Sequence, residues 1–241
     1  MPPKRFDRAL ISFLNRSEVD ALLACPDRAT WTGQRDHALL LLAIQTGLRA
    51  SELTRLTCGD VHLGSGPYVS CHGKGRKDRI TPLTTGTVAT LRVWLMERAG
   101  GSADTLFPTR TGRPLSRDAV KSRLAKYATL AAQSCPSLRT KRISAHVLRH
   151  TAAMQLLRAG IDTSVIALWL GHEQVQTTQI YLHADLTLKE RALARTRPPA
   201  TKPGRFRPSD SLLACAWWGR PRPAPPTTPI RHPRSPVAAP P

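Results

Sequence analysis

The chain has 241 residues, 41% of them hydrophobic, and its 36 Lys and Arg exceed its 16 Asp and Glu to give a net charge of +20. This length is enough for one large hydrophobic core or two small domains. The positive surplus favours a polyanionic partner such as nucleic acid, although an anionic membrane surface or an acidic protein would also attract it.

The cysteines and the apolar runs exclude several classes of protein. The five cysteines are scattered and form no CxxC pair, which argues against a secreted protein built on disulfides. The longest apolar run, Ala38–Ile44, is too short to span a bilayer. Met1–Arg8 is not followed by the apolar region and cleavage site of a signal peptide. We therefore expect a soluble cytoplasmic protein without a membrane partner.

The first half of the chain is predicted to be helical with one β-hairpin. Ser17 resembles an N-cap, and Gly47 resembles the stop of an apolar helix. The glycine-punctuated segment HGKGRKD resembles a turn between two short strands. The predicted helices lie at Ser17–Ala24, Asp36–Gln45 and Ser51–Leu56, and the predicted strands at Pro67–Cys71 and Arg79–Leu83.

From Thr87 to about Arg195 the predicted elements are all helices. Ser116, Ser144 and Asp162 each resemble an N-cap, while Gly160 and Gly171 resemble helix ends. The predicted helices lie at Thr87–Arg98, 117–133, 145–159, 163–170 and 177–195.

The composition changes sharply near Thr196. Residues 197–241 contain 13 of the 21 prolines, eight Lys or Arg and one acid, Asp210. Such a segment cannot bury enough apolar surface to offset its ordering entropy. We therefore predict a leader at 1–14, a folded domain at 15–195 and a disordered basic tail at 196–241.

Four segments are polar where the pattern predicts core, or basic where a simple turn would suffice. In one of them His146 and Arg149 are three apart and share a helix face. A histidine can move a proton near neutral pH, and an arginine can hold a phosphate through two parallel hydrogen bonds. A solvated helix face explains the same pair. The segments are TGLRASEL (46–53), GKGRKDR (73–79), HVLRHTAA (146–153) and LGHEQVQTTQIYLH (170–183).

The other three segments have two explanations each. Arg49 and Glu52 form either a surface ion pair of little energetic value or an arginine oriented by a carboxylate. Lys74 lies either in an ordinary charged hairpin or at a tip that reaches a phosphate. Tyr181 is either a core tyrosine or a nucleophile, which would need activation because a phenol has a pKa of about 10.

A metal site is the other chemistry to consider. The candidate ligands match no familiar zinc spacing, and the chain contains no HExxH motif. We therefore expect no metal. The ligands considered are His146, His150, His172 and His183, and a second set of Cys58, His62, Cys71 and His72.

Taken together and in order, these segments resemble the tyrosine recombinase, or phage integrase, family over roughly residues 15–190. The family's signature runs Arg, then Lys on a β-hairpin, then His-x-x-Arg, then His, then Tyr. The resemblance implies a mainly α catalytic domain (α+β) with a small antiparallel β-sheet. The matching residues are Arg49, Lys74, His146, Arg149, His172 and Tyr181.

The resemblance also implies a role for each residue. Tyr181 would attack the scissile phosphate in line with the leaving 5′-oxygen and form a 3′-phosphotyrosyl enzyme. Arg49 and Arg149 would hold the non-bridging oxygens, and His172 would donate a further hydrogen bond. His146 would assist removal of the proton from Tyr181.

The remaining implied roles belong to the hairpin and to Glu52. Lys74 would protonate the leaving oxygen, Glu52 would orient the active-site cations, and Arg76, Lys77 and Arg79 would contact DNA. These cations replace the Mg²⁺ of other phosphoryl transfers, so no cofactor is implied. The implied partners are double-stranded DNA and further copies of the chain in a tetrameric synapse, with a nucleoid-associated location.

The chain departs from the family pattern at both ends. Family members usually carry an N-terminal domain that clamps the DNA, whereas only a short segment precedes residue 15 here. After Tyr181 relatives usually have an ordered element that docks on a neighbouring subunit; Leu186–Arg195 could serve as this element here, but the chain then becomes rich in proline. The expected function is site-specific DNA strand exchange during integration or excision of a mobile element. The alternatives are a DNA-binding remnant without recombination activity and a type IB topoisomerase-like relaxation of DNA.

Overall fold

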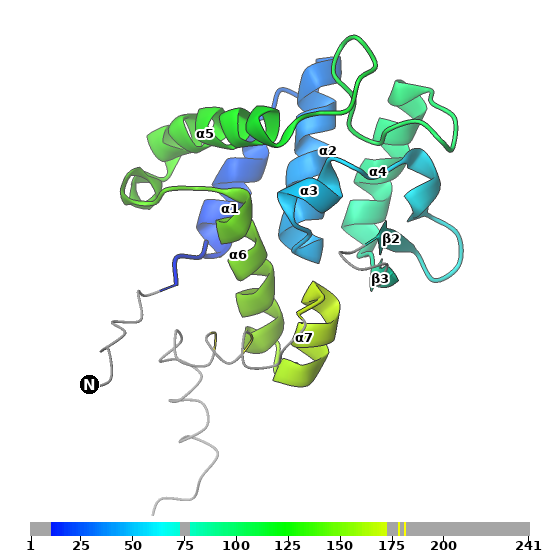
Figure 1. Cartoon of the computed structure of the whole chain (residues 1–241). Coiled ribbons are helices and arrows are strands. Elements are labelled where there is room, and N and C mark those ends of the chain that lie inside the picture. Colours follow the sequence, from blue (N-terminus) through cyan, green and yellow to red (C-terminus); the bar gives the residue numbers. More distant parts are fainter. Residues whose placement is uncertain (1–10, 73–77, 173–177, 179–180, 182–241) are drawn as a thin grey trace, which may run out of the picture. The chain divides into compact units, whose positions relative to one another are not determined.

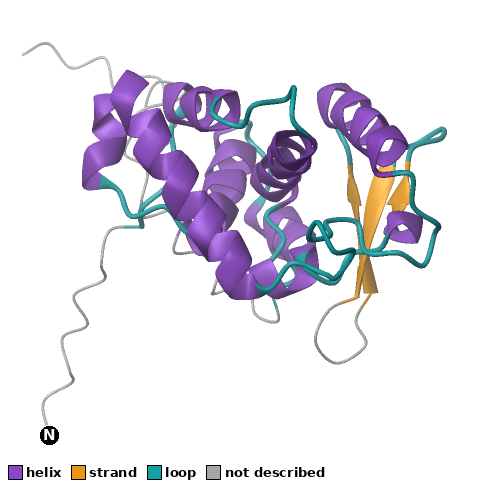
Figure 2. Ribbon diagram, turned by 90° about the horizontal axis from the view of Figure 1, so that it is seen from above, coloured by secondary structure: helices purple, strands orange, loops and turns teal. Residues whose placement is uncertain are grey.

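The computed structural model describes residues 11–72 and 78–172 together with Thr178 and Tyr181. Helices make up most of this region, and one small sheet lies at its side (Figures 1 and 2). The predicted mainly α fold with a small antiparallel sheet is therefore confirmed. Within the described residues, no helix combines the length and the apolar character needed to cross a membrane.

Three predicted helix starts are confirmed in the second half of the chain. Helices α5, α6 and α7 begin directly after Ser116, Ser144 and Asp162. Each of these side chains accepts a hydrogen bond from a backbone N–H two or three residues on, which satisfies a donor that the helix itself leaves unpaired. The three helices span Arg117–Ser134 (α5), Ala145–Arg158 (α6) and Thr163–Leu170 (α7).

Helix α1 spans Arg16–Ala24 and has a different cap from the one predicted. Asn15, rather than Ser17, accepts the N–H of Glu18 at 2.9 Å, and the Glu18 carboxylate accepts the N–H of Asn15 at 2.8 Å. This reciprocal capping box satisfies two donors at once, so it decides where the helix begins. Leu14, which the sequence placed in the leader, is 2% exposed and donates its N–H to Thr151 of α6 at 2.9 Å.

Helix α2 spans Trp31–Thr46 and begins five residues before the predicted start. The prediction began at Asp36, shortly before the apolar run, but Arg35 is buried as well. The Asp36 carboxylate accepts hydrogen bonds from Arg35 at 2.8 Å, from Tyr127 at 2.8 Å and from Arg123 at 3.1 Å. A buried charge that is paired in this way can lie in a core, and here it joins α2 to α5.

Helix α2 is the centre of the fold. Its apolar side chains are buried almost all the way round, as expected for a helix covered on several sides. It packs against α6 on one side and α4 on the other (Figure 1). Helix α4 spans Thr85–Arg98 and stops at Ala99, whose φ of 52° is left-handed, so the predicted stop at Gly100 is one residue late.

The sheet has three antiparallel strands in the order β1-β2-β3. The predicted hairpin is confirmed with a shift of one residue in each strand, and β1 was not predicted because it has only two residues. Val69 and Cys71 alternate with less buried neighbours along β2, which is the pattern of a strand with one buried face. The strands span Val61–His62 (β1), Tyr68–His72 (β2) and Asp78–Pro82 (β3), and β2 pairs with β3 from Tyr68↔Pro82 to His72↔Asp78.

Gly47 ends α2 and brings it against α6 and α7. Its φ is +66°, and a Cβ built on it would lie 2.6 Å from the Leu170 side chain and 3.1 Å from the Ala152 Cβ. The position therefore requires glycine for two reasons: its φ is left-handed, and the side chains of α6 and α7 leave no room for a Cβ. The chain then turns into α3, which spans Ala50–Leu53 and is shorter than the predicted 51–56.

Replacing Gly47 with alanine should destabilise the protein more than the backbone angle alone explains. Gly66 has a similar φ of +68°, but a Cβ at this position would meet nothing within 4 Å, so it is a matched control. We expect Gly66→Ala to lower the free energy of unfolding by about 1–2 kcal/mol from the left-handed backbone alone. Gly47→Ala should lower it by roughly 1–3 kcal/mol more because of overpacking. Urea unfolding of the two variants measures the difference, and equal losses would contradict the predicted clash.

Candidate active site

The turn after α2 carries Arg49 and Glu52, and local hydrogen bonds hold them together. Glu52 accepts the backbone N–H of Arg49 at 2.7 Å and its guanidinium Nη1 at 3.0 Å. The same carboxylate accepts two bonds from Arg79 of β3, at 3.0 and 2.8 Å. Glu52 is therefore the shared partner of two arginines that come from different elements of the fold.

Glu52 stays ionised in this cluster. Burial alone would raise the pKa of its carboxyl, but the hydrogen bonds from Arg79 and Arg49 bring the pKa below its ordinary value. The contact of Arg79 was not expected, because the sequence assigned this residue to DNA. Its side chain is only 12% exposed and lies on Glu52. A Cβ at Gly171, after α7, would come within 2.9 Å of the Arg79 guanidinium, so the strand packs closely on this cluster.

Arg149 of α6 is the third arginine near the end of α2, and it bonds to backbone carbonyls rather than to Glu52. It is 3% exposed, and its guanidinium donates to the carbonyl of Gly47 at 2.7 Å and to that of Leu170 at 2.5 Å. Both carbonyls belong to helix C-termini, where they lack a helical partner and carry partial negative charge. Burial and the charge of Arg49 lower the pKa of Arg149 to about 10, so it remains a cation at neutral pH.

Arg49 completes the pair of cations. It donates to the carbonyl of Gly171 at 3.3 Å, and 45% of its side chain is exposed to solvent. Arg149 is oriented by two backbone carbonyls, and Arg49 by a carbonyl and by Glu52, which it shares with Arg79. Two oriented and partly uncompensated arginines make a site for an oxyanion such as a phosphate.

His172 follows Gly171 and lies beside these cations. Its Nδ1 is 2.8 Å from the hydroxyl oxygen of Thr178. Burial and the charges of Arg149 and Arg49 lower the pKa of His172 to about 4, so its ring is neutral at neutral pH. A neutral imidazole can donate one hydrogen bond and accept another, which suits a group that supports an anion without carrying charge.

Tyr181 is buried between two histidines. It is 1% exposed, and its hydroxyl lies 3.0 Å from Nδ1 of His150. Its ring stacks on that of His172, with centroids 6.5 Å apart and planes 12° apart. Burial raises the pKa of the phenol, while the charge of Arg149 acts in the opposite direction. Tyr181 therefore lies within the electrostatic reach of an arginine that could hold a phosphate.

His146 lies at the edge of this group and contacts its neighbour one turn on, His150. Its ring meets the ring of His150 edge to face, with centroids 4.3 Å apart, and His146 itself is exposed to solvent. Burial of part of the ring and the charge of Arg149 lower the pKa of His146. Sequence reasoning considered His150 only as a metal ligand and missed its contact with Tyr181. Its place one turn after His146 in HVLRH was the available signal.

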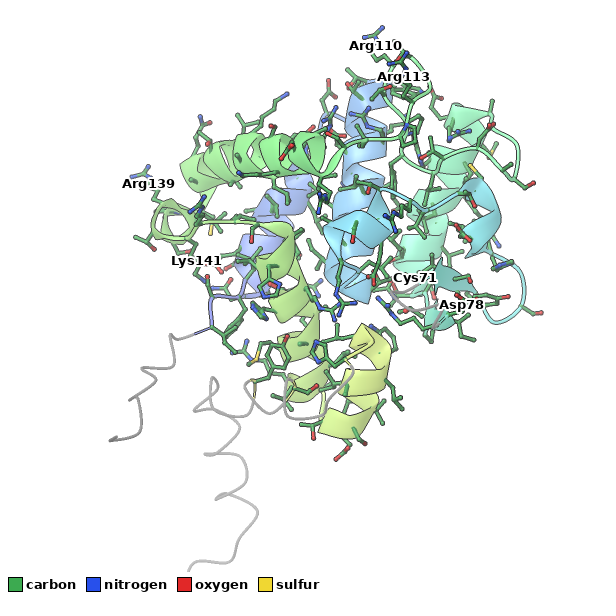
Figure 3. All side chains as sticks on the ribbon, viewed as in Figure 1. Cys71, Asp78, Arg110, Arg113, Arg139 and Lys141 are labelled. Carbon is green, nitrogen blue, oxygen red and sulfur yellow. The ribbon has the colours of Figure 1, made fainter. Side chains whose placement is uncertain are left out.

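The structure thus brings most of the predicted residues into one cluster. The members are Arg49, Glu52, Arg79, Arg149, His172 and Tyr181, with His146 at the edge. Lys74, Arg76 and Lys77 lie outside the described residues. Cys71 and Asp78 lie on the two strands that flank the segment 73–77 (Figure 3), and β3 packs against α7. Across the part of the chain that the structure describes, no group of His, Cys, Asp and Glu is placed to hold a metal ion.

Comparison with known proteins identifies the family. The model of the phage integrase family matches residues 12–187. The Sinorhizobium fredii protein y4rC, whose name describes an integrase/recombinase, is 55% identical over 214 residues, which cover 89% of this chain and 64% of that protein. The tyrosine recombinase XerD of Yersinia pestis is 40% identical over 177 residues, which cover 70% of this chain and 56% of XerD. The chain thus spans about three fifths of the length of these relatives.

Solved structures agree with the sequence comparisons. The crystal structure of XerA recombinase aligns with a TM-score of 0.66 and 29% identity, over 82% of this chain and 68% of XerA. XerH site-specific recombinase, in its post-cleavage complex with a palindromic difH substrate, aligns with a TM-score of 0.66 and 26% identity, over 77% of this chain and 53% of XerH. The shared fold, the family match and the ordered set of basic residues around one tyrosine show that the chain belongs to the phage integrase family of tyrosine recombinases.

Proposed function

We propose that this chain catalyses site-specific cleavage and rejoining of DNA strands, in the integration or excision of a mobile element. The observation that carries the proposal is the position of Tyr181, buried beside His150 and His172 and within reach of the charge of Arg149. A tyrosine among cations that can hold a phosphate has the parts needed for a phosphotyrosine intermediate.

In the proposed reaction, Arg49 and Arg149 bind the two non-bridging oxygens of the scissile phosphate. The Tyr181 oxygen forms a bond to phosphorus, and the bond from phosphorus to the 5′-oxygen breaks. The phenol proton passes to a water molecule as the new bond forms, with His146 assisting its removal, and Lys74 donates a proton to the leaving oxygen. His172 donates a hydrogen bond to the phosphate. Rejoining reverses these steps, so the energy of the broken bond is kept in the phosphotyrosine and no cofactor is required.

Glu52 supports this reaction by positioning rather than by contact with DNA. Its hydrogen bonds hold Arg49 and Arg79 in fixed geometry, and preorganised charge is worth more in catalysis than charge that must reorganise. The Arg79 contact with Glu52 favours a role in this charge cluster over the predicted contact with DNA. Arg76 and Lys77 stay predicted DNA contacts.

Double-stranded DNA is the proposed partner because the chain carries a net charge of +20. Arg110, Arg113 and Arg139 project to solvent at the periphery of the described region (Figure 3). The XerH structure, solved on its own DNA substrate, is a further support by similarity. Assembly of four copies into a synapse and a location at the nucleoid are inferred from family membership.

A suicide substrate with a nick close to the cleavage position tests the proposal. The short fragment released on cleavage diffuses away, so the covalent intermediate accumulates. We expect an adduct on denaturing gels, and peptide mapping should place the DNA on Tyr181. An adduct on Tyr68 or Tyr127 would show that the nucleophile is wrong. DNA binding without any adduct would favour a binding remnant, and relaxation of plasmids that lack a specific site would favour a topoisomerase.

A further inference from the structure

His150 is the hydrogen-bond partner of Tyr181, although neither the sequence nor the proposed mechanism gives it a role. Its Nδ1 lies 3.0 Å from the phenol oxygen, and the two rings meet edge to face with centroids 5.5 Å apart and planes 67° apart. His150 lies on α6 next to Arg149, so one helix turn carries both this contact and the buried cation. The geometry connects the residue that would attack to the helix that would hold the phosphate.

The direction of this hydrogen bond follows from the surroundings. Burial, together with the nearby His146 and Arg149, lowers the pKa of His150 to about 4, so the ring is neutral and one of its nitrogens is an acceptor. A buried tyrosine hydroxyl needs an acceptor for its proton. Among the described residues, no partner of this hydroxyl other than His150 is found. Nδ1 therefore accepts the bond, and the phenol donates it.

The bond adds a directional contact to the apolar packing that buries the Tyr181 ring. Tyr181 packs with Ala153 and Met154 of α6 and with Ile166 and Leu170 of α7. Apolar contacts bury a ring, but they do not select the direction of its hydroxyl. A hydrogen bond does select it, because the bond weakens steeply away from its preferred distance and angle.

We propose that His150 is a positioning residue for the nucleophile, which holds the Tyr181 hydroxyl against α6, the helix that carries Arg149, by accepting the phenol hydrogen bond at Nδ1. This inference rests on the proposed function, in which Tyr181 attacks the phosphate. His150 does not need to take the proton in this role. An acceptor at the place of Nδ1 is sufficient, and this is the property that the experiment isolates.

Two substitutions separate an acceptor from a base. His150→Asn places an amide oxygen near the former Nδ1 but cannot hold a proton. His150→Phe keeps a planar ring and removes the acceptor. On the nicked substrate at saturating DNA, we expect His150→Phe to cleave about 10- to 100-fold more slowly, since a misplaced reacting group costs about that much. His150→Asn should stay within about fivefold of the wild type, as expected when one hydrogen-bond acceptor replaces another. DNA affinity should not change in either variant.

A measurement without DNA tests the contact itself. Tyrosine labelled with ¹³C at Cζ gives one NMR signal for each of the three tyrosines, and Tyr181→Phe identifies the signal of Tyr181. We expect that signal to shift in His150→Phe and to return toward its wild-type position in His150→Asn. His62→Phe, on the exposed face of β1, is the control and should change neither the Tyr181 signal nor the cleavage rate.

Each result either supports or overturns the inference. A wild-type cleavage rate in His150→Phe, or an unmoved Tyr181 signal, would show that the contact does not position the nucleophile. If His150→Asn were as slow as His150→Phe while both variants stayed folded, the ring would be needed as a base and the positioning role would be wrong. If Tyr181→Phe still formed the adduct, the proposed function would fail while the NMR result stood by itself.

Discussion

Replacing Tyr181 with phenylalanine should abolish DNA cleavage and leave DNA affinity unchanged. The substitution removes only the hydroxyl, and the remaining ring still fills the apolar site between α6 and α7. Loss of the nucleophile in a covalent mechanism typically lowers the rate by roughly 10⁴-fold or more, which places the variant below detection in a gel assay. The lost hydrogen bond to His150 should lower the free energy of unfolding by only about 0.5–1.5 kcal/mol.

Adduct formation measures the loss of cleavage by Tyr181→Phe, and a binding isotherm at one salt concentration measures its DNA affinity. Tyr68→Phe is the matched control, because Tyr68 lies on β2 and stacks on His62 rather than on a group of the site. This control should cleave at the wild-type rate. Residual cleavage by Tyr181→Phe at more than a small fraction of that rate would mean that another group attacks the phosphate.

Lys74→Ala should be nearly inactive on ordinary DNA and should recover on a substrate whose bridging 5′-oxygen is replaced by sulfur. A general acid typically contributes about 10²–10⁴-fold to the rate. A thiolate leaves without a proton, because a thiol has a pKa of about 8.5 and an alcohol has a far higher one. Lys74 lies outside the described residues, so this prediction depends on its position between two glycines in GKGRKDR.

The sulfur-substituted substrate also distinguishes the general acid from the other cations of the proposed site. Arg49→Ala should be slow on both substrates, because an arginine that stabilises charge is needed whichever atom leaves. Lys77→Ala should keep most of its activity on ordinary DNA. If Lys77→Ala were the variant rescued by sulfur, the acid would be Lys77 and the role assigned to Lys74 would be withdrawn. Single-turnover rates on the two substrates decide between these outcomes.

The local parts of the fold could be predicted from the sequence because their causes are local. An N-cap needs only a short polar side chain and an N–H two or three residues away, so Ser116, Ser144 and Asp162 were recognised. Gly47 and Gly171 were recognised as helix ends because both adopt left-handed angles that glycine favours. The prediction of Ser17 as the cap of α1 was wrong. Asn15 and Glu18 each accept the backbone N–H of the other, and this reciprocal capping box starts the helix earlier.

The sequence by itself also determined which residues are predicted to carry the chemistry, because the order Arg, Lys, His-x-x-Arg, His, Tyr is a property of the chain. Only the tertiary structure decided what those residues touch. Arg79 bonds to Glu52, Arg149 bonds to the carbonyls of Gly47 and Leu170, and Tyr181 bonds to His150. These partners lie between 21 and 102 positions apart. Such contacts depend on how α2, α6, α7 and the hairpin pack, which no local pattern of residues encodes.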